Sequence, residues 1–160
     1  MNIKKIFSVI LIAFLVIIIS FVFYNKKYTD EQNKIKTEQT DGIRYITING
    51  TPISVEVADT LPAEARGLGG RTSLAENHGM LFVFDYPSRH DFWMKDMKFS
   101  IDMIWFDENL QVIYVKKNAT PESYPNSFGP AQNSKYVLEV VSGFVDQHNI
   151  KIGDSASFNL

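Results

Sequence analysis

The chain has 160 residues, of which 45% are hydrophobic and 21% are charged, and its net charge is −2. This length fits one domain and little more. The absence of cysteine excludes disulfides, thiolate nucleophiles, cysteine-ligated zinc and lipid attachment through cysteine. Residues 44–160 hold 10 basic and 14 acidic groups. That balance argues against a nucleic-acid partner, because such a protein needs a basic face to neutralise phosphates.

The beginning of the chain predicts a membrane anchor over residues 1–24. Ile6–Tyr24 is a run of 19 residues without charge, close to the length that spans a hydrocarbon core of about 30 Å. A cleaved signal peptide, the alternative, has a shorter apolar region followed by a small-residue cleavage site, which this run lacks. We therefore expect an uncleaved signal-anchor, so that the protein is a single-pass protein of the cell membrane with its globular domain outside the cytoplasm.

Residues 25–42 are polar and charged, with few large apolar side chains. Such a segment cannot bury enough surface to pack, so we expect a flexible tether. It leads into a globular domain over residues 43–160.

Short apolar or alternating runs bounded by turn residues predict strands along the domain. The Asn49-Gly50 pair predicts a hairpin turn, and Asn118–Ser134 predicts a long loop. Two short helices are expected, one after the cap Thr60 and one after Ser142. The expected strands are Ile43–Ile48, Ile53–Val57, Met80–Phe84, Phe92–Met97, Met103–Phe106, Val112–Lys116, Tyr136–Val141 and a last strand at the end of the chain. This pattern predicts a mainly β fold with two short helices (α+β), built as a compact antiparallel sandwich or irregular barrel and preceded by one transmembrane helix.

Charged residues interrupt the apolar stretch from His90 to Phe106. On a straight strand Trp93 and Lys95 would share a face, so the Lys95 ammonium could lie against the indole or contact a ligand. Alternatively, Lys95 extends from the sheet rim into water while its stem covers apolar surface.

Two carboxylates and two arginines complete the candidate site. Asp102 and Glu139 each lie in an apolar strand, where a carboxylate must be paired, hydrogen-bonded or neutral. They could meet as an acid–base pair; alternatively, Asp102 bonds backbone amides and Glu139 faces solvent. Arg66 and Arg71 flank a glycine segment and could clamp an anion; alternatively, they lie near a helix C-terminus.

Motifs for other chemistry are missing from the sequence. It contains no phosphate-binding loop, no dinucleotide fingerprint and no nucleophile elbow. The three histidines lack metal-ligand spacing. We therefore expect no metal and no cofactor.

Five ordered blocks, "RGLGGRTSL", "HGMLFVF", "FWMKDMKFSIDMIWFD", "YVLEVVSG" and "IKIGD", resemble the bacterial and archaeal domain of unknown function 192 family. The resemblance covers about Ile53 to Phe158. It implies a compact, mainly β fold, often behind a signal or anchor, and no established activity. The chain departs from the family pattern at Gly69, at Asp96 and Met97, and at Ser100-Ile101. The family pattern falls on Arg66, Gly67, Leu68, Arg71, Gly79, Met80, Phe82, Trp93, Met94, Lys95, Asp102, Glu139, Gly143, Gly153 and Asp154.

Two functions remain open at this point. The first is a tethered, non-enzymatic domain that binds a small ligand or an envelope protein in a cleft near Trp93, Lys95 and Asp102. The second is a small envelope enzyme that uses the carboxylates of Asp102 and Glu139 together with Lys95. The absence of a nucleophile with its base favours the first. The candidate binding residues are Trp93, Lys95, Asp102, Glu139, Arg66 and Arg71.

Overall fold

The computed structural model describes residues 18–29 and 44–159. The chain divides into two units, Met1–Gly42 and Ile43–Leu160. In the first unit residues 18–29 form a helix, in which the Thr29 hydroxyl donates a hydrogen bond to the Asn25 carbonyl at 2.9 Å. The beginning of the predicted tether is therefore helical, because residues 25–29 contain no glycine or proline that would end the helix.

No helix in the described part of the chain is long and apolar enough to cross a membrane. Residues 1–17 of the predicted anchor and residues 30–42 of the predicted tether lie outside the described residues. The anchor thus gains no support from the structure and stays a prediction.

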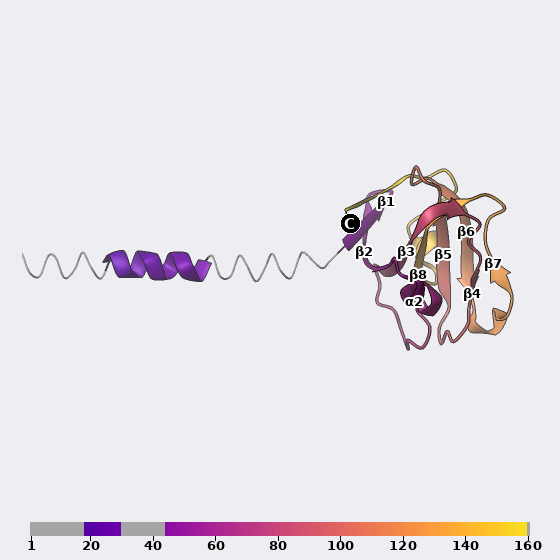
Figure 1. The fold of residues 1–160 in the computed structure, drawn as a ribbon, viewed down its shortest axis with the longest axis horizontal. Helices are drawn as coiled ribbons and strands as arrows, with labels where there is room; N and C mark the ends of the chain where they lie inside the picture. Colours follow the sequence, from indigo (N-terminus) through magenta and orange to yellow (C-terminus); the bar gives the residue numbers. More distant parts are fainter. Residues whose placement is uncertain (1–17, 30–43, 160) are drawn as a thin grey trace, which may run out of the picture. The chain divides into compact units, whose positions relative to one another are not determined.

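The second unit is a mainly β domain, as predicted, with three short helical segments instead of two (Figure 1). A seven-stranded sheet has the order β6-β5-β8-β3-β2-β1-β9, and a two-stranded sheet pairs β4 with β7. The strands of the large sheet are β1 (Arg44–Ile48), β2 (Thr51–Ala58), β3 (His78–Ser88), β5 (Ile101–Phe106), β6 (Val112–Ala119), β8 (Ser134–Val141) and β9 (Ala156–Asn159). The small sheet consists of β4 (Phe92–Trp93) and β7 (Ser127–Phe128), and the helical segments are α2 (Leu61–Arg66), η1 (Pro121–Ser123) and α3 (Phe144–Gln147).

Local signals in the sequence placed most of these elements correctly. Asn49 and Gly50 have positive φ angles of 50° and 80° and turn β1 into β2, as the hairpin turn requires. Helix α2 begins after Thr60 with a proline in its first turn and ends at Gly67. Helix α3 begins one residue later than predicted, with the left-handed Gly143 as its N-cap in place of Ser142.

The sheet is mixed, not purely antiparallel. Among the described strands β2 and β3 pair in parallel, while the other pairs are antiparallel. A parallel pair needs a crossover connection of about a dozen residues or more. Residues 59–77, which include α2, supply this connection. The crossover brings α2 and the glycine segment after it onto one face of the sheet.

The sheet curls into a half-barrel whose edge strands meet at one end. The Val112 amide donates to the Asp154 carbonyl at 2.8 Å, and the Ala156 amide donates to the Leu110 carbonyl at 2.8 Å. A bridge between Gln111 and Ser155 joins the same two segments. The irregular-barrel alternative is therefore nearer to the observed fold than the sandwich.

Strand β5 lies between two hydrophobic clusters, and all six of its residues are buried. Ile104 and Phe106 belong to the first cluster, which takes residues from the strands of the curled sheet and from α3. Met103 and Trp105 belong to the second cluster, which includes Leu68 and other residues outside the strands. Successive side chains of a strand point to opposite faces. One face of β5 therefore packs in the first cluster and the other face packs in the second.

Candidate functional site

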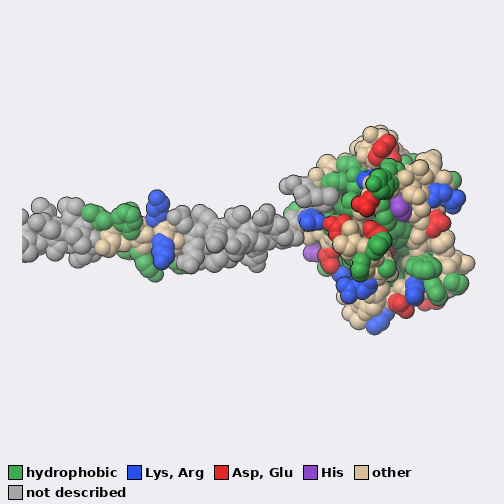
Figure 2. Space-filling model, viewed as in Figure 1, with side chains coloured by type: hydrophobic (Ala, Val, Ile, Leu, Met, Phe, Trp, Pro, Cys, Tyr) green, Lys and Arg blue, Asp and Glu red, His purple; other side chains and the backbone are tan. Residues whose placement is uncertain are grey.

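A cavity of about 890 Å³ opens between α2, the glycine segment 67–70, strand β3 and the segment 89–97. Figure 2 shows hydrophobic side chains between charged groups of both signs on the face of the domain that carries α2. Aromatic rings of Phe82, Phe84, Phe92 and Trp93 form part of the lining. The charged and titratable residues of the lining are Glu64, Arg66, Arg89, His90, Asp91, Lys95, Asp96 and Glu139.

Glu139 contributes a buried carboxyl group to this cavity. The residue is only 4% exposed, and its Oε2 atom has no hydrogen-bond partner. Across the strands it pairs with Met80 and Met103, so its neighbours in the sheet are apolar. Burial raises the pKa of Glu139 to about 8, although the Leu68 amide and the Arg71 charge act in the opposite direction. The group therefore carries a proton at neutral pH.

Gly67 lets the backbone approach this carboxyl group closely. Its φ angle is 50°, a conformation that residues with a side chain rarely adopt. A Cβ atom at this position would lie 3.3 Å from the Cζ atom of Phe82 and 3.7 Å from the Oε2 atom of Glu139. Glycine at this position therefore keeps the space beside the carboxyl group free.

His90 contributes the second polar atom that lacks a partner. Its ring stacks on Phe84 with centroids 3.5 Å apart, and its Nε2 atom is buried without a hydrogen-bond partner. Burial lowers the pKa of His90, while a hydrogen bond to the Tyr86 backbone and the charge of Asp91 raise it. The His90 carbonyl also accepts a hydrogen bond from the Trp105 indole at 2.8 Å. This bond ties the segment to strand β5.

Trp93 and Lys95 both line the cavity, but the strand predicted at Phe92–Met97 is only two residues long. After β4 the chain turns: the Met97 amide donates to the Met94 carbonyl, and Asp96 has a φ angle of 58°. The buried side chain of Met94 fixes this turn against the second cluster. The shared-strand argument for Trp93 and Lys95 was therefore wrong, although both side chains remain accessible from solvent.

The aromatic partner of Trp93 is another ring instead of the Lys95 ammonium. Trp93 is 53% exposed and packs edge-on against Tyr124, with the ring centroids 6.0 Å apart. Within residues 44–159 the cation–π contact is made by Lys116, whose Nζ atom lies 4.5 Å from the Phe128 ring centroid. The Lys95 charge is thus left for water or a ligand.

The two arginines have different surroundings and do not form a clamp. Arg66 lines the cavity. Arg71 instead forms a bidentate ion pair with Glu56, with N–O distances of 2.5 and 2.7 Å. This pair raises the pKa of Arg71 and lowers that of Glu56.

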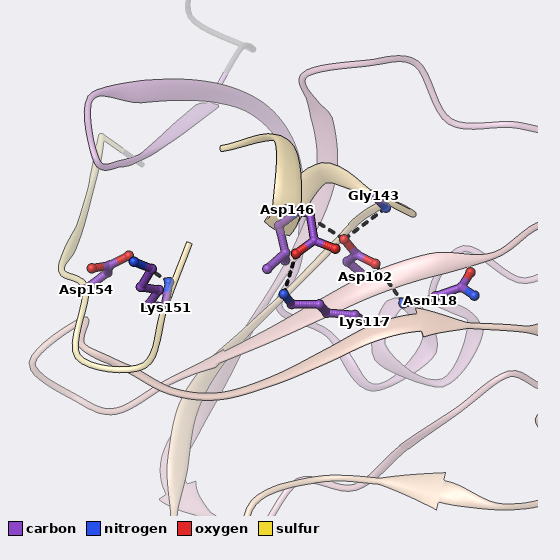
Figure 3. Close-up of polar contacts among 8 residues, drawn as sticks. Asp102, Lys117, Asn118, Gly143, Asp146, Lys151 and Asp154 are labelled. Atoms are coloured by element: carbon purple, nitrogen blue, oxygen red, sulfur yellow. Dashed lines mark hydrogen bonds and ion pairs between the residues drawn. The ribbon is translucent and has the colours of Figure 1, made fainter. Parts of the chain in front are cut away.

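Asp102 lies outside the cavity and has a structural environment. Its Oδ1 accepts a hydrogen bond from the Asn118 amide at 2.8 Å, and its Oδ2 accepts bonds from the Gly143 and Val145 amides, each at 3.0 Å (Figure 3). Asp102 is directly opposite Val140, and Glu139 is opposite Met103. Side chains that are opposite each other share a face, so Asp102 and Glu139 point to opposite faces of the sheet. The acid–base pair that the enzyme hypothesis required is not formed.

Sequence reasoning missed His90, Arg89 and the two phenylalanines of β3 as lining residues. The histidines were set aside because they lack metal-ligand spacing. The useful signal was the position of His90 two residues before an aromatic pair, "FW". That position indicates an environment that removes water from the ring, but not that β3 supplies the opposing wall.

Comparisons with known proteins give a family and a fold. The model of the family DUF192, described as "Uncharacterized ACR", matches residues 44–158. A UPF0127 protein of Thermococcus sibiricus is 31% identical over 113 residues. The match covers 66% of this chain and 66% of that protein, just under two thirds of its length. The crystal structure of a protein of unknown function from Novosphingobium aromaticivorans is 29% identical and has a TM-score of 0.68, with 72% of this chain and 84% of that chain covered. A suggested transcription regulator of Sinorhizobium meliloti is 27% identical with a TM-score of 0.68, with 72% and 92% covered.

Proposed function

This chain belongs to the DUF192 family, and we propose that its globular domain binds a small molecule in the cavity between α2 and the segment 89–97. One observation carries this proposal. Two buried polar atoms, Oε2 of Glu139 and Nε2 of His90, lack hydrogen-bond partners and belong to residues that line the same cavity. A buried polar atom without a partner costs about 1–3 kcal/mol. A ligand that bonds both atoms would recover this cost.

The rest of the lining suits a small molecule. Ligand cavities combine mostly apolar walls with a few polar groups that fix orientation, and their volumes are about 300–1,000 Å³. Here aromatic rings supply the walls, while Arg66, Lys95 and Asp96 lie among the charged groups around them. These positive and negative charges are mixed, so the cavity does not select for one sign of charge over its whole surface.

The predicted site is thereby revised. Trp93, Lys95, Glu139 and Arg66 remain candidates for ligand contact, because all four line the cavity. Arg71 stabilises the fold through its ion pair with Glu56. Asp102 stabilises it by accepting hydrogen bonds from backbone amides. His90 joins the site.

The first prediction concerns Lys95 and has a matched control. Lys95→Met removes an exposed charge that lines the cavity, whereas Lys98→Met removes an exposed charge that does not. We expect both variants to keep the free energy of unfolding within about 1 kcal/mol of the wild type, as surface substitutions usually do. The full chain should be purified from its native membranes or cytosol, and small molecules released on denaturation should be identified by mass spectrometry. A molecule that accompanies the wild type and Lys98→Met but is depleted in Lys95→Met supports the proposal.

Contrary results would be clear. Equal recovery of every co-purified molecule from both variants, and from Trp93→Ala compared with Tyr45→Ala, would show that the cavity is not the binding site. Tyr45 is a suitable control because it is 41% exposed and does not line the cavity.

We also propose that the domain is tethered to the cell membrane on the extracytoplasmic side. The support is the uncharged run Ile6–Tyr24 and its lack of a signal-peptide cleavage site. The second prediction follows: washing membranes with alkaline carbonate should leave the full-length chain in the pellet. Release into the supernatant of a chain shortened by its first 25 residues or so would show that this segment is a cleaved signal peptide.

A further inference from the structure

The group that Glu139 presents to the cavity has a definite hydrogen-bonding character. The carboxyl lies between apolar strand neighbours, Met80 and Met103, and beside the ring of Phe82. Arg71, the basic side chain whose charge acts on it, is already paired with Glu56. An isolated carboxylate in such a place is costly, so the neutral acid is the favoured form. A neutral carboxylic acid donates one O–H hydrogen bond.

His90 presents the opposite character. Because Nε2 has no partner, the hydrogen bond to the Tyr86 backbone belongs to the other ring nitrogen. A backbone carbonyl accepts, so that nitrogen carries the proton in the neutral ring. Nε2 is then an acceptor. The cavity therefore offers an O–H donor at Glu139 and a nitrogen acceptor at His90, with neither group charged.

Resting on the proposed function, we infer that the ligand places an uncharged carbonyl of the amide type against Glu139, with an aromatic or otherwise apolar body along Phe82 and Phe84. An ammonium group at this point would require the buried acid to ionise. A ligand carboxylate would have to be buried beside an acid that can give only one hydrogen bond. An amide carbonyl accepts that bond without burying charge, and a hydrogen-bond donor elsewhere on the ligand would satisfy Nε2 of His90.

The experiment uses three probes of nearly equal size: benzamide, benzylamine and benzoate. Binding to the full-length chain in mild detergent is measured by ligand-observed NMR at millimolar probe concentration. Benzamide is expected to bind more tightly than the other two. The variant Glu139→Met, which has no hydrogen-bond donor, should lose most of this binding. Glu139→Gln, whose amide can donate in place of the acid, should retain it.

A pH profile tests the same point independently. Benzamide binding to the wild type should be constant below about pH 8 and weaken about tenfold per pH unit above it, as the fraction of protonated Glu139 falls. Glu139→Gln should show no such loss. Around Glu139, α2 carries Glu64 and Arg66, and Arg71 follows α2. The other charged and titratable groups, across the cavity, are Arg89, His90, Asp91, Lys95 and Asp96. These groups remain in Glu139→Gln, so any pH effect that they cause persists there.

Several results would overturn the inference. One is tighter binding of benzylamine than of benzamide, especially if the benzylamine affinity rises with pH. Another is tighter binding of benzoate than of benzamide. Unchanged benzamide binding in Glu139→Met, or no benzamide binding to the wild type, would also contradict it. The proposed function is tested separately. It fails if the recovery of co-purified molecules is unchanged by substitution of Lys95 or Trp93. A cavity that takes a cation instead of an amide would therefore contradict the inference and leave the proposed function standing.

Discussion

Asp102→Asn should lower the free energy of unfolding by about 1.5–3 kcal/mol, the value of a charge-assisted hydrogen bond in a protein. The carboxylate accepts three backbone N–H bonds, from Asn118, Gly143 and Val145. The asparagine side chain retains one acceptor oxygen, and its NH₂ group faces at least one of these donors. A buried amide is then left without a partner. Urea unfolding of the full chain, followed by near-UV circular dichroism, measures the loss.

Asp146→Asn is the matched control for this prediction. Asp146 pairs with Lys117 in the same region of the fold (Figure 3), but its side chain is 71% exposed. An exposed ion pair contributes about 0–1 kcal/mol. The removal of the Asp146 charge should therefore cost less than the removal of the Asp102 charge. If the two variants lose equal stability, the backbone bonds of Asp102 do not hold the start of α3 and the end of β6 as we describe.

Glu139 should make the domain less stable as pH rises. Its pKa is raised to about 8 in the folded state, compared with 4.5 for the unperturbed group. Between these values the folded state binds a proton that the unfolded state has released. The contribution of Glu139 to the free energy of unfolding therefore falls by about 1.4 kcal/mol per pH unit. It is fully present below about pH 4.5 and is lost once the pH exceeds about 8. Glu139→Gln removes this titration and should be more stable than the wild type at pH 8.

The measurement is the free energy of unfolding from pH 5 to pH 9 for the wild type, Glu139→Gln and Glu108→Gln. Glu108 is exposed in the turn between β5 and β6, so Glu108→Gln is the control for the same substitution at the surface. The difference between the wild type and Glu139→Gln isolates one group, because all other titrating residues are shared. A difference that stays constant over this range would mean that Glu139 is not a buried, protonated acid.

Local sequence signals determined much of the secondary structure. The Asn49-Gly50 turn, the Pro62 start of α2 and the alternation of β2 are each decided by a few neighbouring residues, so their physical causes are visible in the sequence. The same holds for the mainly β class. The prediction for Phe92–Met97 failed because the turn after Trp93 depends on burial of Met94 against residues far away in the sequence.

The sequence by itself determined that Asp102 and Glu139 lie in apolar strands. A carboxyl group in such a strand must be paired, hydrogen-bonded or neutral. Only the tertiary structure decided what each one does. The register of β5 against β8 offsets the two residues by one position, and since a strand alternates its faces, that offset sends one carboxyl to backbone amides and the other to the cavity. Likewise, the parallel pairing of β2 with β3 brings the glycine segment over Glu139. Pairings between distant strands set these contacts, and no local pattern in the chain encodes them.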